Sequence, residues 1–188
     1  MIYTLTDNDL KNASAVLRAR GPDANSYLQG QFTQDVNAAT GGRTYGLWLD
    51  QKGRCLADGH VLRLAKDDFL VVSFSMSAKD LLARLEAYLI ADEVELTDET
   101  ATWAGILLWG EGAATIAVPA GTVSFASRRA GTGSVQWLVP TGSVGEVLTG
   151  LRKAGAVERD VAAAELDRLR QGVPAVPADI GPRDLPNE

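Results

Sequence analysis

The side chains best suited to chemistry in this sequence lie on one predicted strand. In an extended strand alternate residues share a face, so Asp58, His60, Leu62 and Leu64 would lie in one row. Two polar residues followed by two leucines predict a face that begins at a cavity rim and ends in the core. The simpler interpretation is an Asp58–His60 pair at a sheet edge. The residues alone favour this simpler interpretation, because ionic pairs outside active sites are common.

The sequence lacks the residues that other kinds of catalytic site, or a metal site, would need. The chain has one histidine and one cysteine, which cannot supply a zinc site, so we expect no metal. Cys55 is better explained as a small buried apolar residue than as a nucleophile. A Ser-His-Asp triad could use only His60, and the sequence has no Gly-x-Ser-x-Gly elbow. Walker and Rossmann glycine patterns are also missing, and no catalytic residue is assigned.

The composition is that of an ordinary globular protein. The chain has 188 residues, 46% hydrophobic and 22% charged, which predicts one domain or two intimately packed lobes. A net charge of −6 repels nucleic acid and anionic lipid, so we expect no direct nucleic-acid contact and no membrane partner. The N-terminus lacks the basic and apolar regions of a signal peptide. Together with the single cysteine, this predicts a cytoplasmic protein.

Hydrophobic patterns predict a mixture of strands and helices. Strands are expected at residues 14–20, 45–49, 55–64, 69–74, 94–96, 103–109, 123–127 and 135–139, and helices at 23–31, 77–90, 144–154 and 161–170. Turns are expected at 40–42 and 50–53, the second of which closes a β-hairpin. The tail from Gly172 carries four prolines and should be irregular. Strands and helices mix without strict βαβ alternation, which indicates an α+β fold.

Two helix starts have recognisable caps. Asp23 could cap helix 23–31. Ser77, with Asp80 three residues later, resembles a capping box at the start of helix 77–90. A leucine-rich stripe on this second helix predicts that it packs on the core.

Five segments in order carry a resemblance to a known family. They read RGPDA at 20–24, YLQGQFTQDV at 27–36, YGLWLDQKGRCLAD at 45–58, ADEVELTD at 91–98, and LDRLRQGVP at 166–174 followed by ADI and LPNE. The chain therefore resembles the front part of YgfZ-type folate-binding proteins, which are relatives of the T-protein of glycine cleavage.

The resemblance implies a fold, a ligand and a set of contacts. The fold would be a T-protein-like α+β core of packed ferredoxin-like halves with mostly antiparallel sheets. Residues 1–188 would form one folate-binding domain with lobes at about 1–97 and 98–188, without a C-terminal β domain. Tetrahydrofolate would bind in a central cavity, its pterin edge on carboxylates and amides and its glutamate tail on arginine. By position, the folate contacts would be Gln31, Thr33, Asp35, Tyr45, Asp58 and Arg168.

The sequence also departs from the family patterns. T-proteins have an acidic pair at the hairpin strand, where this chain has Ala57 and Asp58, and their pterin-holding glutamate falls on Thr132. Both changes favour the YgfZ side. The YgfZ signature Lys-Gly-Cys-x-Gly-Gln-Glu would follow the last residues, and the chain stops at Glu188 before it.

Three functions follow from this resemblance. The first is a folate-binding accessory protein in iron–sulfur cluster assembly or repair, or in tRNA modification, with iron–sulfur proteins as partners. The second is an aminomethyltransferase. The third is a non-catalytic relic that acts by protein contacts. Whether the chain is an enzyme stays open among them.

Overall fold

The computed structural model describes residues 1–5, 15–37 and 43–185, and the predicted turn at 40–42 lies outside them. Contacts divide the chain into two compact units. The hairpin unit contains the elements from β2 to β6 with Thr100, together with the segment that begins at Val176. The α3–α4 unit contains β1 and the elements between Ala101 and Ala175. These bounds differ from the expected lobes because β1 pairs with β7 and β10, not with the strands that follow it.

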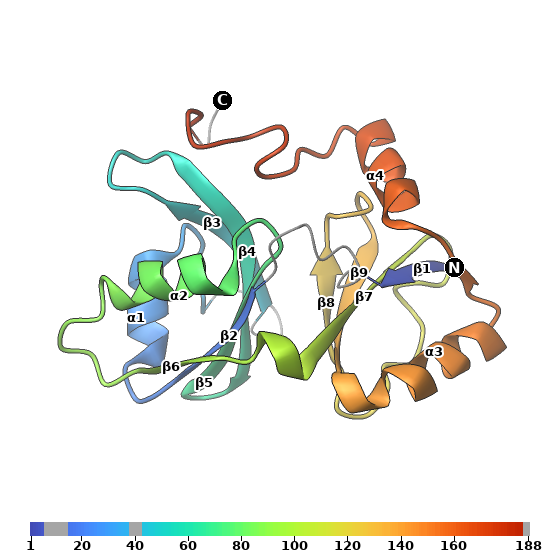
Figure 1. Ribbon diagram of the computed structural model, residues 1–188, viewed down its shortest axis with the longest axis horizontal. Coiled ribbons are helices and arrows are strands. Elements are labelled where there is room, and N and C mark those ends of the chain that lie inside the picture. The colour runs from blue at the N-terminus through green and yellow to red at the C-terminus, as the bar shows by residue number, and fades with distance from the viewer. Residues whose placement is uncertain (6–14, 38–42, 186–188) are drawn as a thin grey trace. The chain divides into compact units, whose positions relative to one another are not determined.

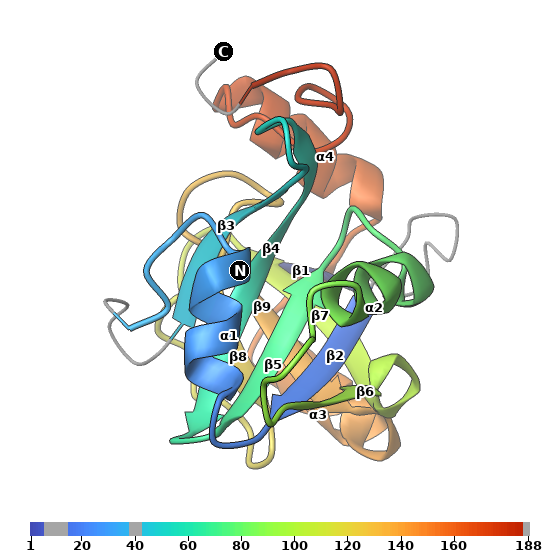
Figure 2. The same cartoon turned by 90° about the vertical axis from the view of Figure 1, so that its left-hand side faces the viewer.

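The hairpin unit is a five-stranded antiparallel sheet with two helices on one face (Figures 1 and 2). Its sheet order is β3-β4-β5-β2-β6. The elements are β2 (Ala15–Arg20), α1 (Ala24–Gln31), β3 (Arg43–Leu49), β4 (Cys55–Ala65), β5 (Asp68–Ser73), α2 (Ala78–Glu86) and β6 (Glu95–Asp98). Alternate strand residues join Leu28, Leu81 and Leu85 of the helices in one apolar core, because each strand turns every second side chain to the helices.

Two paired glycines allow aromatic rings to pack directly on this sheet. Gly46 of β3 lies opposite Gly59 of β4. A Cβ at Gly46 would lie 2.8 Å from the ring of Phe32, and one at Gly59 would lie 2.4 Å from the main-chain oxygen of Val72. The rings of Phe32 and Trp48 pack with centroids 4.6 Å apart. The fold therefore requires glycine at these positions for space.

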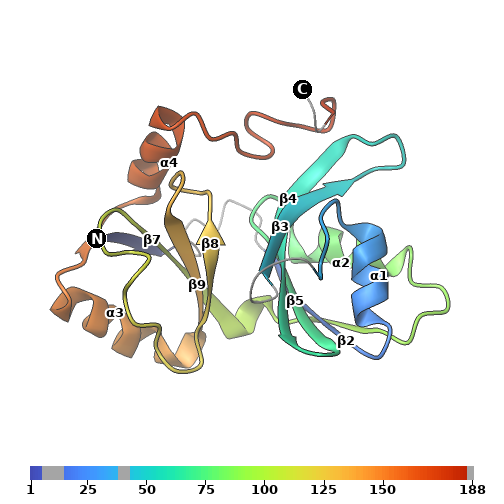
Figure 3. The ribbon, with the colours of Figure 1, turned by 180° about the vertical axis from the view of Figure 1, so that it is seen from behind.

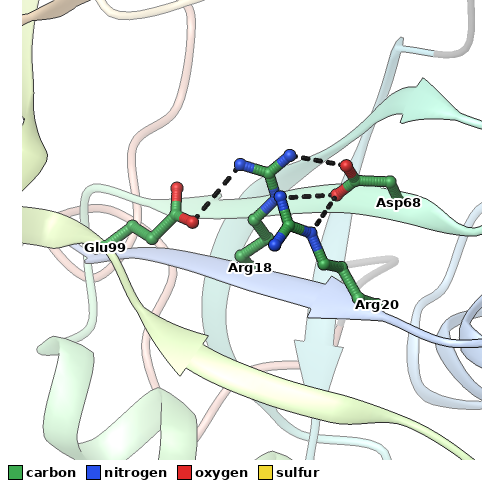
Figure 4. A network of polar contacts seen from close by, with 4 residues as sticks. All are labelled: Arg18, Arg20, Asp68 and Glu99. Carbon is green, nitrogen blue, oxygen red and sulfur yellow. Dashed lines mark hydrogen bonds and ion pairs between the residues drawn. The ribbon is translucent and has the colours of Figure 1, made fainter.

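An ion-pair network joins β2 to its neighbours (Figure 4). Arg18 binds both carboxylate oxygens of Asp68, at 2.7 and 2.5 Å, and lies 3.3 Å from Glu99. Arg20 adds a contact of 3.4 Å to Asp68. The Arg18 guanidinium lowers the pKa of Asp68, which in turn raises the pKa of Arg18.

The α3–α4 unit is a second five-stranded sheet, visible from behind in Figure 3. Its order is β10-β1-β7-β9-β8, and only β1 and β10 pair in parallel. Its elements are β1 (Ile2–Leu5), β7 (Trp103–Trp109), β8 (Val123–Ser127), β9 (Ser134–Pro140), α3 (Val144–Lys153), β10 (Val157–Glu158) and α4 (Val161–Arg170), with a 3₁₀ turn at Thr141–Ser143. A further 3₁₀ turn, at Thr100–Thr102, begins on the last residue of the hairpin unit before Ala101. Helix α3 packs with Ile106 and Leu108, whereas α4 packs with Leu107 and Trp109, so the helices lie on opposite faces.

The structure confirms the predicted α+β class with mostly antiparallel sheets, and it confirms the hairpin formed by β3 and β4. Ser77 caps α2 as predicted, since its hydroxyl accepts from the Asp80 N–H at 3.1 Å. Asp23 does not cap α1, because its carboxylate accepts from the Glu93 N–H at 2.9 Å. Helix α2 ends at Glu86, before the predicted end at residue 90. No described helix is long and apolar enough to cross a membrane.

Replacing Gly59 with alanine is expected to lower the free energy of unfolding by about 1–3 kcal/mol, because the new methyl group would overlap the Val72 carbonyl. The matched control is Gly30→Ala on α1, where an added Cβ meets no atom within 4 Å. Alanine is the better helix former, so this control should leave stability unchanged or raise it by up to about 1 kcal/mol. Urea unfolding measures both variants, and equal effects would contradict the close contact at Gly59.

Replacing Asp68 with asparagine should lower the free energy of unfolding by about 1.5–3 kcal/mol at neutral pH, because charge-assisted hydrogen bonds to Arg18 are lost. The folded pKa of Asp68 is lowered, so its contribution is present above the unfolded pKa of about 4 and disappears as pH falls through the folded value. The exposed neighbour Asp67, 4.0 Å from Lys66, supplies the control Asp67→Asn. Urea unfolding at several pH values should show this pH-dependent gap only for Asp68→Asn, and a gap that does not change with pH would contradict the account.

Candidate functional site on the sheet of the hairpin unit

Asp58 lies in the interior of the sheet, with its carboxylate held by two hydroxyl groups. Its Oδ1 accepts from the Ser75 hydroxyl at 2.6 Å and its Oδ2 from the Tyr45 hydroxyl at 3.1 Å. The Asp58 N–H donates to Ser75 Oγ at 3.1 Å, and its carbonyl accepts from the Ser73 hydroxyl at 2.8 Å. The predicted sheet-edge location is wrong, because β4 has β3 on one side and β5 on the other. Both main chain and side chain of Asp58 are therefore fixed.

Aromatic and apolar side chains continue the same row of β4. His60 lies opposite Tyr45 in the strand register, and their rings are 5.1 Å apart with an interplanar angle of 57°. His60 is 6% exposed and Leu62 is fully buried, whereas Leu64 is 39% exposed. The predicted row of β4 side chains, which was to run from a cavity rim to the core, is therefore buried only as far as Leu62. Pairing of β4 with β3 stops at Leu62, and its pairing with β5 shifts register between Arg63 and Ala65.

The neighbouring position on β4 faces the other way. Ala57 is fully buried in the core beneath the helices, on the opposite face from Asp58. The acidic pair expected of T-proteins would therefore place only its second member on the face of Tyr45. Cys55 is also fully buried, as predicted, and burial raises the pKa of its thiol.

The remaining predicted contacts of the hairpin unit lie elsewhere. Thr33 extends the edge of β3, where its N–H donates to the Leu47 carbonyl at 3.2 Å and its hydroxyl accepts from the Leu47 N–H at 2.8 Å. Asp35 is exposed, and its carboxylate accepts from the Asn37 N–H at 2.8 Å.

Gln31 lies at the end of α1 on the helix-covered side, where its Oε1 accepts from Arg84 at 3.1 Å. The structure brings Tyr45 and Asp58 together and separates Gln31 from them by the sheet. Ser75 and Arg84 were not among the predicted site residues. A serine two residues after the end of a strand could have indicated Ser75, but no sequence pattern pairs Arg84 with Gln31.

Arg168 belongs to the α3–α4 unit and is 3% exposed. Its guanidinium binds both oxygens of Glu165, at 2.9 and 2.5 Å, and donates to the Val173 carbonyl. These bonds tie the last turn of α4 to the segment that follows it. A folate contact by Arg168 stays a prediction, beside this structural role.

By the resemblance, the pterin-holding glutamate of T-proteins would fall on Thr132. Its N–H and its hydroxyl both donate to Gln171 Oε1 at 2.8 Å. Gln171 also donates to the Ala130 carbonyl at 3.3 Å, so one carboxamide holds this turn to the end of α4. Thr132 therefore has a neutral hydroxyl group at this position, in contrast to the charged carboxylate of a glutamate.

Replacing Arg168 with methionine is expected to lower the free energy of unfolding by about 1.5–3 kcal/mol, because the buried guanidinium loses its charge-assisted hydrogen bonds to half-exposed Glu165 and its bond to the Val173 carbonyl. The control is Arg170→Met on the same helix, whose side chain is 67% exposed and pairs with Asp167 at 3.3 Å. That exposed pair should contribute no more than about 1 kcal/mol. Thermal unfolding compares the two, and a similar small loss for both would show that Arg168 is not a structural residue.

Comparisons with known proteins agree with the fold. The family model described as GCVT N-terminal domain matches residues 9–137. Two curated relatives, each named iron-sulfur cluster assembly factor IBA57 homolog, mitochondrial, come from the Cryptococcus neoformans serotype D strains JEC21 and B-3501A. Each is 30% identical over 98 residues, which is 51% of this chain and 26% of the relative. The chain thus matches about a quarter of the length of these relatives.

Among solved structures, the glycine cleavage system aminomethyltransferase T from Bartonella henselae superposes with a TM-score of 0.82. The alignment covers 98% of this chain and 54% of that protein, at 18% identity, and so concerns the fold alone. Since the family model matches more than half of the chain, the protein belongs to the GCVT N-terminal domain family, within the folate-binding T-protein superfamily.

Proposed function

We propose that the chain binds tetrahydrofolate on the Asp58 face of the hairpin unit and acts as an accessory protein in iron–sulfur cluster assembly. Family membership supports the choice of folate, and the IBA57 homologs support the choice of process. The observation that carries the proposal is the Asp58 carboxylate, which two hydroxyl groups hold in the interior of a sheet.

The chemistry of these residues fits a reduced pterin. Each oxygen of Asp58 accepts one described hydrogen bond, and a carboxylate oxygen can accept two. The free lone pairs suit a pair of N–H donors, which the edge of a pterin supplies. The half-buried ring of Tyr45, whose hydroxyl donates to the carboxylate, offers a flat surface for a flat ligand, and the buried ring of His60 packs against it. When bound, tetrahydrofolate would supply one-carbon chemistry, and these residues would orient it.

The rest of the predicted contact set forms a weaker part of the proposal. Thr33 and Asp35 would contribute from the β3 edge and the loop before it. Arg168 would contribute in addition to its bonds with Glu165. We also propose a cytoplasmic location, although the curated relatives are named as mitochondrial. tRNA modification is the alternative process for the same ligand.

Aminomethyl transfer is the second candidate function, and the fold shared with an aminomethyltransferase favours it. General acid–base chemistry of that kind needs a positioned carboxylate, which Asp58 could provide. Two features weigh against it. Asp58 is a single acid at its position, and Thr132 offers a hydroxyl engaged by Gln171 where the T-protein has a glutamate.

Replacing Asp58 with asparagine should weaken tetrahydrofolate binding roughly 10- to 150-fold, because charge-assisted hydrogen bonds contribute about 1.5–3 kcal/mol. Calorimetric titration of the whole chain measures the affinity. The control Asp67→Asn removes the same charge from an exposed turn and should bind as wild type does.

Two outcomes would contradict the proposal. Equal affinities of wild type and Asp58→Asn would place the ligand elsewhere. Absence of binding by wild type at millimolar ligand would favour a relic that acts by protein contacts. Cells that carry only Asp58→Asn should also lose activity of iron–sulfur enzymes, and normal activity would separate the site from cluster assembly.

A further inference from the structure

Arg84 is half-buried and its hydrogen-bond partners are neutral, as are the Asn25 and Asn37 partners of half-buried Arg63. Arg18, Arg152 and Arg168 each bind a carboxylate. Around Arg84 the described residues place no carboxylate within 4.0 Å. Its Nη1 donates to Gln31 Oε1 at 3.1 Å and its Nη2 to the Leu49 carbonyl at 2.8 Å, both of which are neutral acceptors.

Aromatic faces provide the rest of its environment. The guanidinium carbon lies 5.7 Å from the ring centre of Trp48 and 5.3 Å from that of Tyr88. Such cation–π contacts attract a guanidinium but leave its charge uncompensated. Burial lowers the pKa of Arg84, yet an arginine stays protonated at neutral pH. Arg84 lies in the last turn of α2, where the helix dipole favours a cation, but no described carboxylate neutralises its charge, so an anion beside it would still be stabilising.

Gln31 presents a second donor at the same place. Its Oε1 accepts from Arg84, and the NH₂ group of the same carboxamide is therefore a donor next to this contact. Within residues 15–37 and 43–185 no acceptor binds this NH₂ group. Gln31 and Arg84 are both half-buried, and Tyr88 beside them is 39% exposed. Two neighbouring donors with no competing acid match the chemistry of an oxyanion.

We propose that Gln31 and Arg84, with the ring of Tyr88 as a wall, form a binding site for a carboxylate or phosphate oxyanion at the C-terminal end of α1. The site lies on the helix-covered side of the sheet, opposite Asp58, and does not depend on folate binding. Its anion has two sources of the same chemistry: the glutamate carboxylate of a folate, or free phosphate.

The decisive variant is Gln31→Glu. It keeps the shape of the side chain, removes the NH₂ donor and gives Arg84 an internal carboxylate, so it should occupy the site from within. The control is Gln29→Glu on the same helix, which adds an equal charge and keeps the oxygen that accepts the Val36 N–H at 2.8 Å. Melting temperatures of both variants show that neither is unfolded.

The experiment is a titration of the ¹⁵N-labelled chain with sodium phosphate and with sodium glutamate, followed by NMR at low ionic strength. We expect saturable shifts of the Gln31 side-chain NH₂ and of Arg84 Nε–H in wild type and Gln29→Glu. In Gln31→Glu the affinity, read from the neighbouring main-chain amides, should fall by at least roughly tenfold. Absence of saturable shifts with both anions, or equal affinity in Gln31→Glu, would overturn the site.

A titration with tetrahydrofolate distinguishes the two sources. Weaker folate binding by Gln31→Glu than by Gln29→Glu would identify the glutamate tail as the anion. Unchanged folate binding, together with phosphate-dependent shifts at Gln31, would identify free phosphate. If wild type bound no folate, the phosphate arm would still decide the proposal, so its failure is separate from that of the proposed function.

Discussion

The hairpin unit depends on the missing side chain of Gly59. A Cβ at this position would lie 2.4 Å from the Val72 carbonyl and 3.0 Å from the indole nitrogen of Trp48, so any larger residue would push β4 away from its neighbours. This contact holds β4 in one register, with alternate residues turned toward the helices. A slip by one residue would exchange the two faces and move Asp58 into the apolar core. The position of the candidate site therefore follows from close packing at the residue next to it.

The register also explains how the site obtains its fixed geometry. Tyr45 reaches Asp58 from β3, and Ser75 reaches it from the end of β5, so three neighbouring segments converge on one carboxylate. Ligand groups held in this way lose little freedom on binding, which favours affinity and orientation. On the other side of the sheet, Arg84 joins α2 to the ends of α1 and β3 through Gln31 and the Leu49 carbonyl. One small sheet thus has the fixed Asp58 carboxylate on one face and, on the other, the Arg84 guanidinium with neutral hydrogen-bond partners.

The sequence predicts much of this fold because its patterns are local. The hairpin turn, the Ser77 cap and the common face of Asp58 and His60 all follow from spacing within a few residues. Strands β1 and β10, with four and two residues, are too short to give a pattern, and their pairing joins distant segments. Apolar residues beyond Glu86 extend the helical spacing, but the helix ends there. Arg84 binds Gln31, which lies 53 positions away, and Arg168 binds the carbonyl of Val173, which lies 5 positions away. Only the folded chain shows which arginine has an acid beside it.

The central claim is that reduced folate binds on the Asp58 face of the hairpin unit. Mapping of main-chain amide shifts in the ¹⁵N-labelled chain during titration with tetrahydrofolate tests it most directly. The account predicts that the largest saturable shifts fall on Tyr45, on the residues of β4 around Asp58 and on Ser75. Saturable shifts confined to α3, with none around Asp58, would contradict it.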